Sequence, residues 1–354
     1  MIVIAIARYS AVHWGTLKMS RDEQLYCLAA DVEIVRRKSS LLLVSKLTGA
    51  SVRVSDTAEP LLPLLSRGTD MPGLRKLLQE LHPQAFDISK KLGLFLESLE
   101  RVGLLVNEQA AVQFVRGRRK IKLFQVDRMA HLISTLLLKI PQVFRIGIMS
   151  ALILGALVGI AQLAVLNNFP SGRGLVQDFS ILGFLIFIFL VVPFHEAAHA
   201  VACRMAGVEV GSAGLVFHGG LLPGPFVETT QAYRVKGRWA RFCIPAMGPV
   251  VNLLGAGVCA WILLLVVPDH TEYKTIVNYV FMLCLLFVYL DTNPFTPSDG
   301  SHMLEALLDD ELARHNSLSF KKMNHYDRGI IVRYRIVSLL HAVIGIFLLY
   351  LWFA

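Results

Sequence analysis

The sequence predicts a polytopic α-helical membrane protein of about five transmembrane helices, preceded by a small α+β soluble domain at the N-terminus. Two observations lead to this fold class. The 354 residues are 55% hydrophobic and only 17% charged, which is too apolar for an ordinary soluble protein. The apolar residues also gather in runs that are long enough, or nearly so, to cross about 30 Å of hydrocarbon as helices. These runs lie near residues 146–167, 179–203, 243–267, 275–290 and 335–353.

The first 130 residues contain no such run. We therefore predict a soluble domain over residues 1–112, a basic and amphipathic linker over 113–144, and a membrane-embedded domain over 145–354. The opening residues form one short apolar burst without a basic leader, which argues against a cleaved signal peptide. In the linker, the apolar stretch 129–140 is suited to the interface of anionic lipids, and a solvated linker is the alternative.

The distribution of the basic residues gives the orientation. They crowd before the first apolar run, after the second and before the last, whereas the other two loops carry only Arg173 and Lys274. By the positive-inside rule, this predicts a multi-pass protein of the cell membrane with a cytoplasmic N-terminus. The net charge of +9 is thus explained by the lipid bilayer as a partner, and no nucleic acid partner is expected.

The five cysteines include no CxxC pair. They therefore predict neither a disulfide framework nor a zinc site built on cysteine.

The second apolar run ends in a segment that carries ionisable side chains, His195-Glu196-Ala-Ala-His199. Residues four apart on a helix lie on one face, so the two imidazoles are able to bind one metal ion. Glu196 is turned about 100° away and is placed to hold a water molecule. This is the HExxH pattern of zinc peptidases, in which the glutamate is the general base. The short pattern also occurs by chance, but ionisable residues within a membrane are functional by default.

A catalytic zinc site needs a third protein ligand, and Asp299 is the best candidate. It follows the fourth apolar run in a segment that Pro294 and Pro297 prevent from continuing as a helix. Irregular backbone at membrane depth is tolerated where it is buried in protein or lines a wet cavity. We therefore predict that His195, His199 and Asp299 hold a Zn²⁺ ion.

Three motifs in this order resemble the site-2 protease family of intramembrane zinc metallopeptidases. They are His195 to His199, Gly248-Pro249-Val-Val-Asn252 as a GPxxN motif, and Asn293-Pro294-Phe-Thr-Pro-Ser-Asp299-Gly300 as an NP…DG motif. The resemblance covers about residues 180–310, and residues 207–241 are similar to the peptide zinc metalloprotease branch.

This resemblance implies zinc on His195, His199 and Asp299, with Glu196 as the catalytic base. It also implies that Asn252 is catalytic and helps to position the substrate or the tetrahedral intermediate. The chain departs from the pattern at Ser298, where the family has an apolar residue, and at residues 301–302, where aromatic residues are usual.

The N-terminal domain shows strand patterns over residues 32–37, 41–45 and 51–55, the last by strict alternation and the other two by their β-branched and apolar content. Helical patterns follow over 56–66, 72–82 and 88–103. With the phrase LESLERVGLLV, they resemble the winged-helix peptide-recognition domain of enzymes that process ribosomally made peptides. The resemblance implies that an extended leader peptide adds as a strand to the sheet edge. Packing on the membrane domain alone, or binding of DNA, are the alternatives.

Together these patterns predict an intramembrane zinc metalloprotease that hydrolyses a peptide bond in a membrane-associated or ribosomally made precursor peptide. Its partners would be that peptide or membrane-protein substrate and the bilayer. Two alternatives stay open: a catalytically idle membrane scaffold or export partner, and a regulatory protease acting on a transmembrane regulator. The sequence fixes neither the scissile bond nor the oligomeric state, nor the roles of His218 and His302.

Overall fold

The structure is a computed structural model, and its description covers residues 24–36, 40–45, 51–81, 83, 88–106, 120–217, 223–266, 272–318 and 327–353. The chain forms two compact units. One comprises Met1–Ala30 with Glu59–Gln113, and the other Asp31–Ala58 with Phe114–Ala354. The predicted domain boundary at residue 112 lies beside this division, but residues 31–58 group with the second unit.

Five helices in the described part of the chain are long and apolar enough to cross a membrane. They are α5 (Gln142–Val165), the continuous run Ile181–Met205, α9 (Arg238–Leu265), α10 (Glu272–Asp291) and α13 (Arg328–Phe353). The predicted fold class is thereby confirmed. Four of these helices begin a few residues before the apolar runs, because polar residues such as Gln142 and Arg328 form their first turns.

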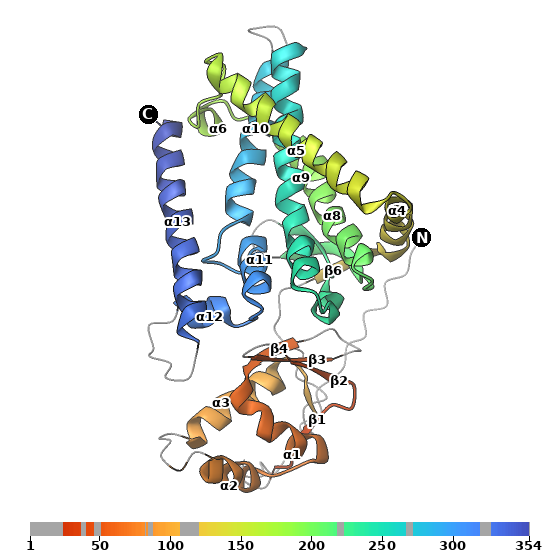
Figure 1. The fold of residues 1–354 in the computed structure, drawn as a ribbon, viewed down its shortest axis with the longest axis vertical. Helices are drawn as coiled ribbons and strands as arrows, with labels where there is room; N and C mark the ends of the chain where they lie inside the picture. The colour runs from red at the N-terminus through yellow and green to blue at the C-terminus, as the bar shows by residue number, and fades with distance from the viewer. Residues whose placement is uncertain are drawn as a thin grey trace, which may run out of the picture. The chain divides into compact units, whose positions relative to one another are not determined.

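Helix α9 is the central element of the membrane unit and packs against α5, α8 (Val192–Met205), α10 and α11 (Asp299–Leu308), as Figure 1 shows. Small residues allow the close approach. A Cβ atom on Gly257 would overlap Ala156 of α5, and one on Gly159 would lie 2.9 Å from the Trp261 indole nitrogen. Close backbone contact at small residues is how membrane helices associate where lipid offers no hydrophobic contrast.

The second span changes its winding just before the HExxH motif. It begins as α7 (Ile181–Ile186), widens into a π-helical turn, η3 (Phe187–Val191), and returns to α-helix in α8. Pro193 follows this turn and has no amide hydrogen to donate within the helix. Single π-turns are frequent at functional sites because they rotate the side chains that follow.

The predicted linker contains regular structure that the sequence analysis did not anticipate. Strand β6 (Lys120–Gln125) pairs antiparallel with β7 (Ser212–Phe217), which pairs with β8 (Pro223–Val227). Helix α4 (Asp127–Lys139) follows and packs on α8. Its exposed side chains include Leu132 and Leu136, which suits the predicted placement of this stretch at a lipid interface.

The N-terminal strands and helices largely follow the sequence prediction. Strands β2 (Val32–Arg36), β3 (Ser40–Ser45) and β4 (Ser51–Ser55) form an antiparallel sheet in that order. Helices α2 (Met71–Leu81) and α3 (Ile88–Arg101) match two of the predicted helices, and β1 (Cys27–Leu28) pairs with β5 (Leu105–Val106).

The helix predicted over residues 56–66 is wrong in detail. A 3₁₀-helix, η1 (Asp56–Leu61), precedes a short α1 (Leu62–Arg67). The reason is that Pro60 and Pro63 lack the amide hydrogens that a continuous α-helix would use.

An ion pair fastens α4 to the end of the second span. Arg204 donates from Nε to Asp127 Oδ1 over 2.7 Å and also pairs with Oδ2, and the Val210 amide donates to Oδ1 over 3.0 Å. Burial alone would raise the pKa of Asp127, but these hydrogen bonds lower it below its usual 3.8. The contact therefore stabilises the fold above the pKa of the unfolded chain and is lost as the pH falls through the folded pKa.

We expect Asp127→Ala to lower the unfolding free energy by about 1–2 kcal/mol at neutral pH, because charged hydrogen bonds are lost. Thermal unfolding in detergent measures this change. The exposed Asp178→Ala serves as the control. The difference between wild type and Asp127→Ala should shrink below pH 4, and a difference that grows in acid would contradict this account.

Candidate metal centre

The three predicted metal ligands lie together in the structure. His195 Nε2 and His199 Nε2 are 3.1 Å apart, and Asp299 Oδ2 lies 3.3 Å from each of them. Among the described residues, these three form the group of His, Cys, Asp and Glu side chains whose ligand atoms lie within 4.8 Å of one another. Both histidines are buried, at 8% exposure. Two imidazoles and one carboxylate are a donor set that suits Zn²⁺ with a fourth position left open.

The outer nitrogens of the two imidazoles have partners of their own. His199 Nδ1 lies 2.8 Å from the carbonyl oxygen of Ile244 in α9. A carbonyl only accepts, so Nδ1 carries the hydrogen and Nε2 keeps its lone pair for a metal. His195 Nδ1 faces a carboxylate oxygen of Asp291 at 3.6 Å.

Gly248 of α9 closes the site on the side of the two histidines. A Cβ atom at this position would lie 2.5 Å from His199 Nε2 and still closer to His195 Nε2. The added methyl would therefore take the space in front of both ligand nitrogens. The space in front of the two nitrogens is open because residue 248 has no side chain, which gives a physical reason for the glycine of the GPxxN motif.

Asp299 reaches the histidines from the first turn of α11. Ser298 caps this helix: its hydroxyl accepts from the Ser301 amide, and the Ser301 hydroxyl accepts from the Ser298 amide in return. The family departure at Ser298 is thus a capping box, which fixes the start of the helix that carries Asp299.

The charge state of Asp299 also suits a metal ligand. Burial alone would raise the pKa of the carboxyl, but the interactions with His195 and His199 hold it well below its ordinary value. Asp299 is therefore a carboxylate at neutral pH, the form in which it binds a metal.

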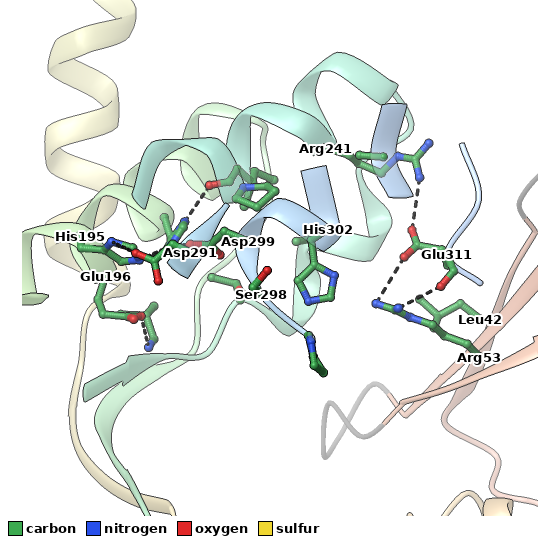
Figure 2. Close-up of a pocket in the computed structure, with 18 residues that line it drawn as sticks. Leu42, Arg53, His195, Glu196, Arg241, Asp291, Ser298, Asp299, His302 and Glu311 are labelled. Carbon is green, nitrogen blue, oxygen red and sulfur yellow. Dashed lines mark hydrogen bonds and ion pairs between the residues drawn. The ribbon is translucent and has the colours of Figure 1, made fainter. Parts of the chain in front are cut away.

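Glu196, the predicted base, is turned toward strand β8. Its Oε2 accepts a hydrogen bond from the Val227 amide over 3.0 Å, so the last residue of this strand orients the carboxylate. Figure 2 shows Glu196 next to His195 at one end of a pocket of about 580 Å³, which also includes Asp291, Asp299 and His302 in its lining. A pocket of this size is in the range of sites that hold a small molecule or a few peptide residues.

The opposite end of the pocket is lined by paired charges. Figure 2 shows Glu311 between Arg53 of β4 and Arg241 of α9, and it pairs with both. Arg53 also donates to Glu305, and Arg241 also pairs with Asp309. Arg53 and Arg241 thus share Glu311 and join strand β4 to the membrane helices within the second unit. This network was not anticipated, because no short sequence pattern links residues so far apart.

The remaining predicted residues are placed differently. Asn252 is 1% exposed, and its side-chain nitrogen donates to Asp291 over 2.7 Å; its predicted catalytic role stays a prediction. His302 lines the pocket, with Nδ1 3.0 Å from Glu305. His218 lies outside the described residues.

Comparison with known proteins agrees with this geometry. Residues 183–274, which hold both the HExxH and the GPxxN segments, match the sequence profile of Peptidase family M50. The resemblance to the site-2 protease family is thereby confirmed, and it implies an intramembrane metalloprotease. The M50 segment ends before Asp299, so the third ligand is supported by the geometry of the structure.

A second comparison extends the similarity only locally. An uncharacterized protein of Methanocaldococcus jannaschii is 30% identical over 70 residues, which are 20% of this chain and 19% of that protein. The match thus spans about a fifth of the relative's length. No solved structure matched the chain.

We expect Gly248→Ala to abolish metal binding, because the methyl fills the space before the two ligand nitrogens. Metal content of the purified protein, measured by mass spectrometry, checks this expectation. The matched control is Gly147→Ala in α5, where an added Cβ meets nothing within 4 Å. Full metal content in Gly248→Ala would show that the ion does not sit between the histidines and α9.

Proposed function

We propose that this chain is a zinc endopeptidase that hydrolyses a peptide bond of a membrane-associated or ribosomally made precursor peptide. The observation that carries the proposal is the convergence of His195, His199 and Asp299 on one point in a pocket that also exposes Glu196. A zinc ion bound there would act as a Lewis acid on the scissile carbonyl and make water more acidic.

The residues of the chain supply the rest of the chemistry. Glu196 takes the proton of the attacking water and returns it to the leaving amine, which is general acid–base catalysis by one carboxylate. The Val227 amide holds one oxygen of Glu196, which keeps the carboxylate facing the pocket. The substrate must be extended where it is cut, since an intact helix engages its carbonyl oxygens in hydrogen bonds.

The proposal predicts how three variants separate metal binding from proteolysis. Wild type should hold about one zinc ion per chain, and His195→Ala and Asp299→Ala should hold little zinc. Glu196→Gln should hold as much zinc as wild type but have no proteolytic activity. Metal content is measured by mass spectrometry. Activity is measured by labelling the new N-termini that appear in isolated membranes incubated with each variant, with the exposed His131→Ala as a matched control.

Cleavage products that depend on Glu196 would identify the substrate and support the proposal. Zinc-free wild-type protein, purified without chelators, would overturn it in favour of the idle membrane scaffold. Products that also form with Glu196→Gln would remove this residue from the reaction.

We further propose that the N-terminal domain lies in the cytoplasm and captures the leader of the precursor. The sheet β2–β3–β4 supports this idea because its outer strands, β2 and β4, offer edges to which an extended peptide is able to add. The basic residues before α5 support the cytoplasmic side.

Removing residues 1–112 should then raise KM for a leader-bearing peptide far more than for a leaderless one, with the peptides taken from the identified cleavage products. The deletion also removes Arg53, which pairs with Glu305 beside the pocket. Arg53→Ala in the full chain is therefore the control. Equal effects of the deletion on both peptides would assign the domain to scaffolding.

A further inference from the structure

One carboxylate beside the metal ligands, that of Asp291, has no part in the proposed reaction. Asp291 is the last residue of α10, eight positions before Asp299, and its side chain is 22% exposed. Figure 2 shows it beside His195 and Asp299, at the end of the pocket that holds the metal ligands. Its Oδ2 is the atom that His195 Nδ1 and the Asn252 amide nitrogen both face.

The direction of the contact indicates its role. The Nε2 atom of His195 faces His199 and Asp299, so Asp291 lies on the far side of the imidazole, against Nδ1. A ligand histidine usually donates its second ring N–H to an acceptor, which fixes the ring and makes the metal-facing nitrogen more basic. Ile244 supplies that acceptor for His199 at 2.8 Å. The carboxylate of Asp291 is the acceptor that faces Nδ1 of His195, at 3.6 Å, an ion-pair contact slightly longer than a hydrogen bond.

Asn252 in turn acts on the carboxylate. Asp291 Oδ2 accepts a hydrogen bond over 2.7 Å, so the nitrogen of the Asn252 amide must be the atom that faces it. Asn252 is almost fully buried, and the residues that line the described pocket include Asp291 but not Asn252. Its contact with the site therefore passes through Asp291.

We propose that Asp291 is a positioning residue that orients His195 for metal binding, and that Asn252 acts by holding Asp291. The chain Asn252–Asp291–His195 joins α9, α10 and α8, so it couples the packing of three spans to one ligand. The inference rests on the proposed zinc site and goes beyond it, because it assigns Asn252 to the metal side of the reaction instead of the substrate.

The test is a titration of the metal-free full chain in detergent with Co²⁺, followed by its visible absorption, and with Zn²⁺ in competition. Wild type is compared with Asp291→Ala, Asp291→Asn, Asn252→Ala and the double variant Asn252→Ala/Asp291→Ala. Asp291→Asn keeps the side-chain volume, so a loss of affinity in both Asp291 variants is not an effect of a cavity. His302→Ala is the control, because the described interactions of His302 include Glu305 but none of the metal-ligand atoms.

We expect both Asp291 variants to bind metal about 10-fold to 100-fold more weakly, the usual loss when the partner of a ligand histidine is removed. The Co²⁺ absorption should change shape, because the geometry of His195 changes. Asn252→Ala should weaken binding in the same direction. The double variant should bind about as tightly as Asp291→Ala, since Asn252 acts through the residue that is already absent.

Two outcomes would overturn the proposal. Metal affinity within about twofold of wild type in both Asp291 variants would remove Asp291 from the ligand sphere. Unchanged affinity in Asn252→Ala, with turnover alone reduced, would return Asn252 to the substrate. If the wild-type chain binds no metal, the proposed zinc site itself is refuted. If the wild type and the variants all bind metal tightly, the zinc site stands and only the role of Asp291 and Asn252 is refuted.

Discussion

The burial of ionisable side chains among apolar helices is the constraint on which the rest of this structure depends. Each such group needs a partner, since an isolated charge or polar atom in hydrocarbon is costly. His195 and His199 meet this need by turning one nitrogen toward Asp299 and the other toward Asp291 or a backbone carbonyl. The surrounding helices accommodate these side chains. A π-helical turn directly precedes the helix that carries both histidines, and Gly248 leaves space in front of their nitrogens.

Much of the fold and the core of the site follow from the sequence because their signals are local. Apolar runs of about 20 residues specify membrane helices regardless of their neighbours. The four-residue spacing of His195 and His199 places both on one helix face. The two prolines before Asp299 predict irregular backbone. Alternating side chains in residues 51–55 likewise identify a strand without reference to its partner.

What sequence reasoning missed depends on contacts between distant segments. Strand β6 shows only a short alternation, over residues 120–123, and its partner β7 lies far along the chain. Asp291 carries no motif signal and is significant only because the helices bring it against His195 and Asn252. The pairing of Arg53 with Glu305 spans 252 positions, so no local pattern announces it. The break in the helix predicted over residues 56–66 is different, because Pro60 and Pro63 are a local signal for it in the sequence.

The order of segments along the chain has a consequence for biosynthesis. The strand β6 is made before the first span, but its partner β7 is made only after the second, and Asp299 only after the fourth. The histidines therefore reach the bilayer without their third ligand. Throughout most of its own translation and insertion, the nascent chain lacks a complete metal site. The proposed metal centre is thus completed late, when most of the spans have already been made.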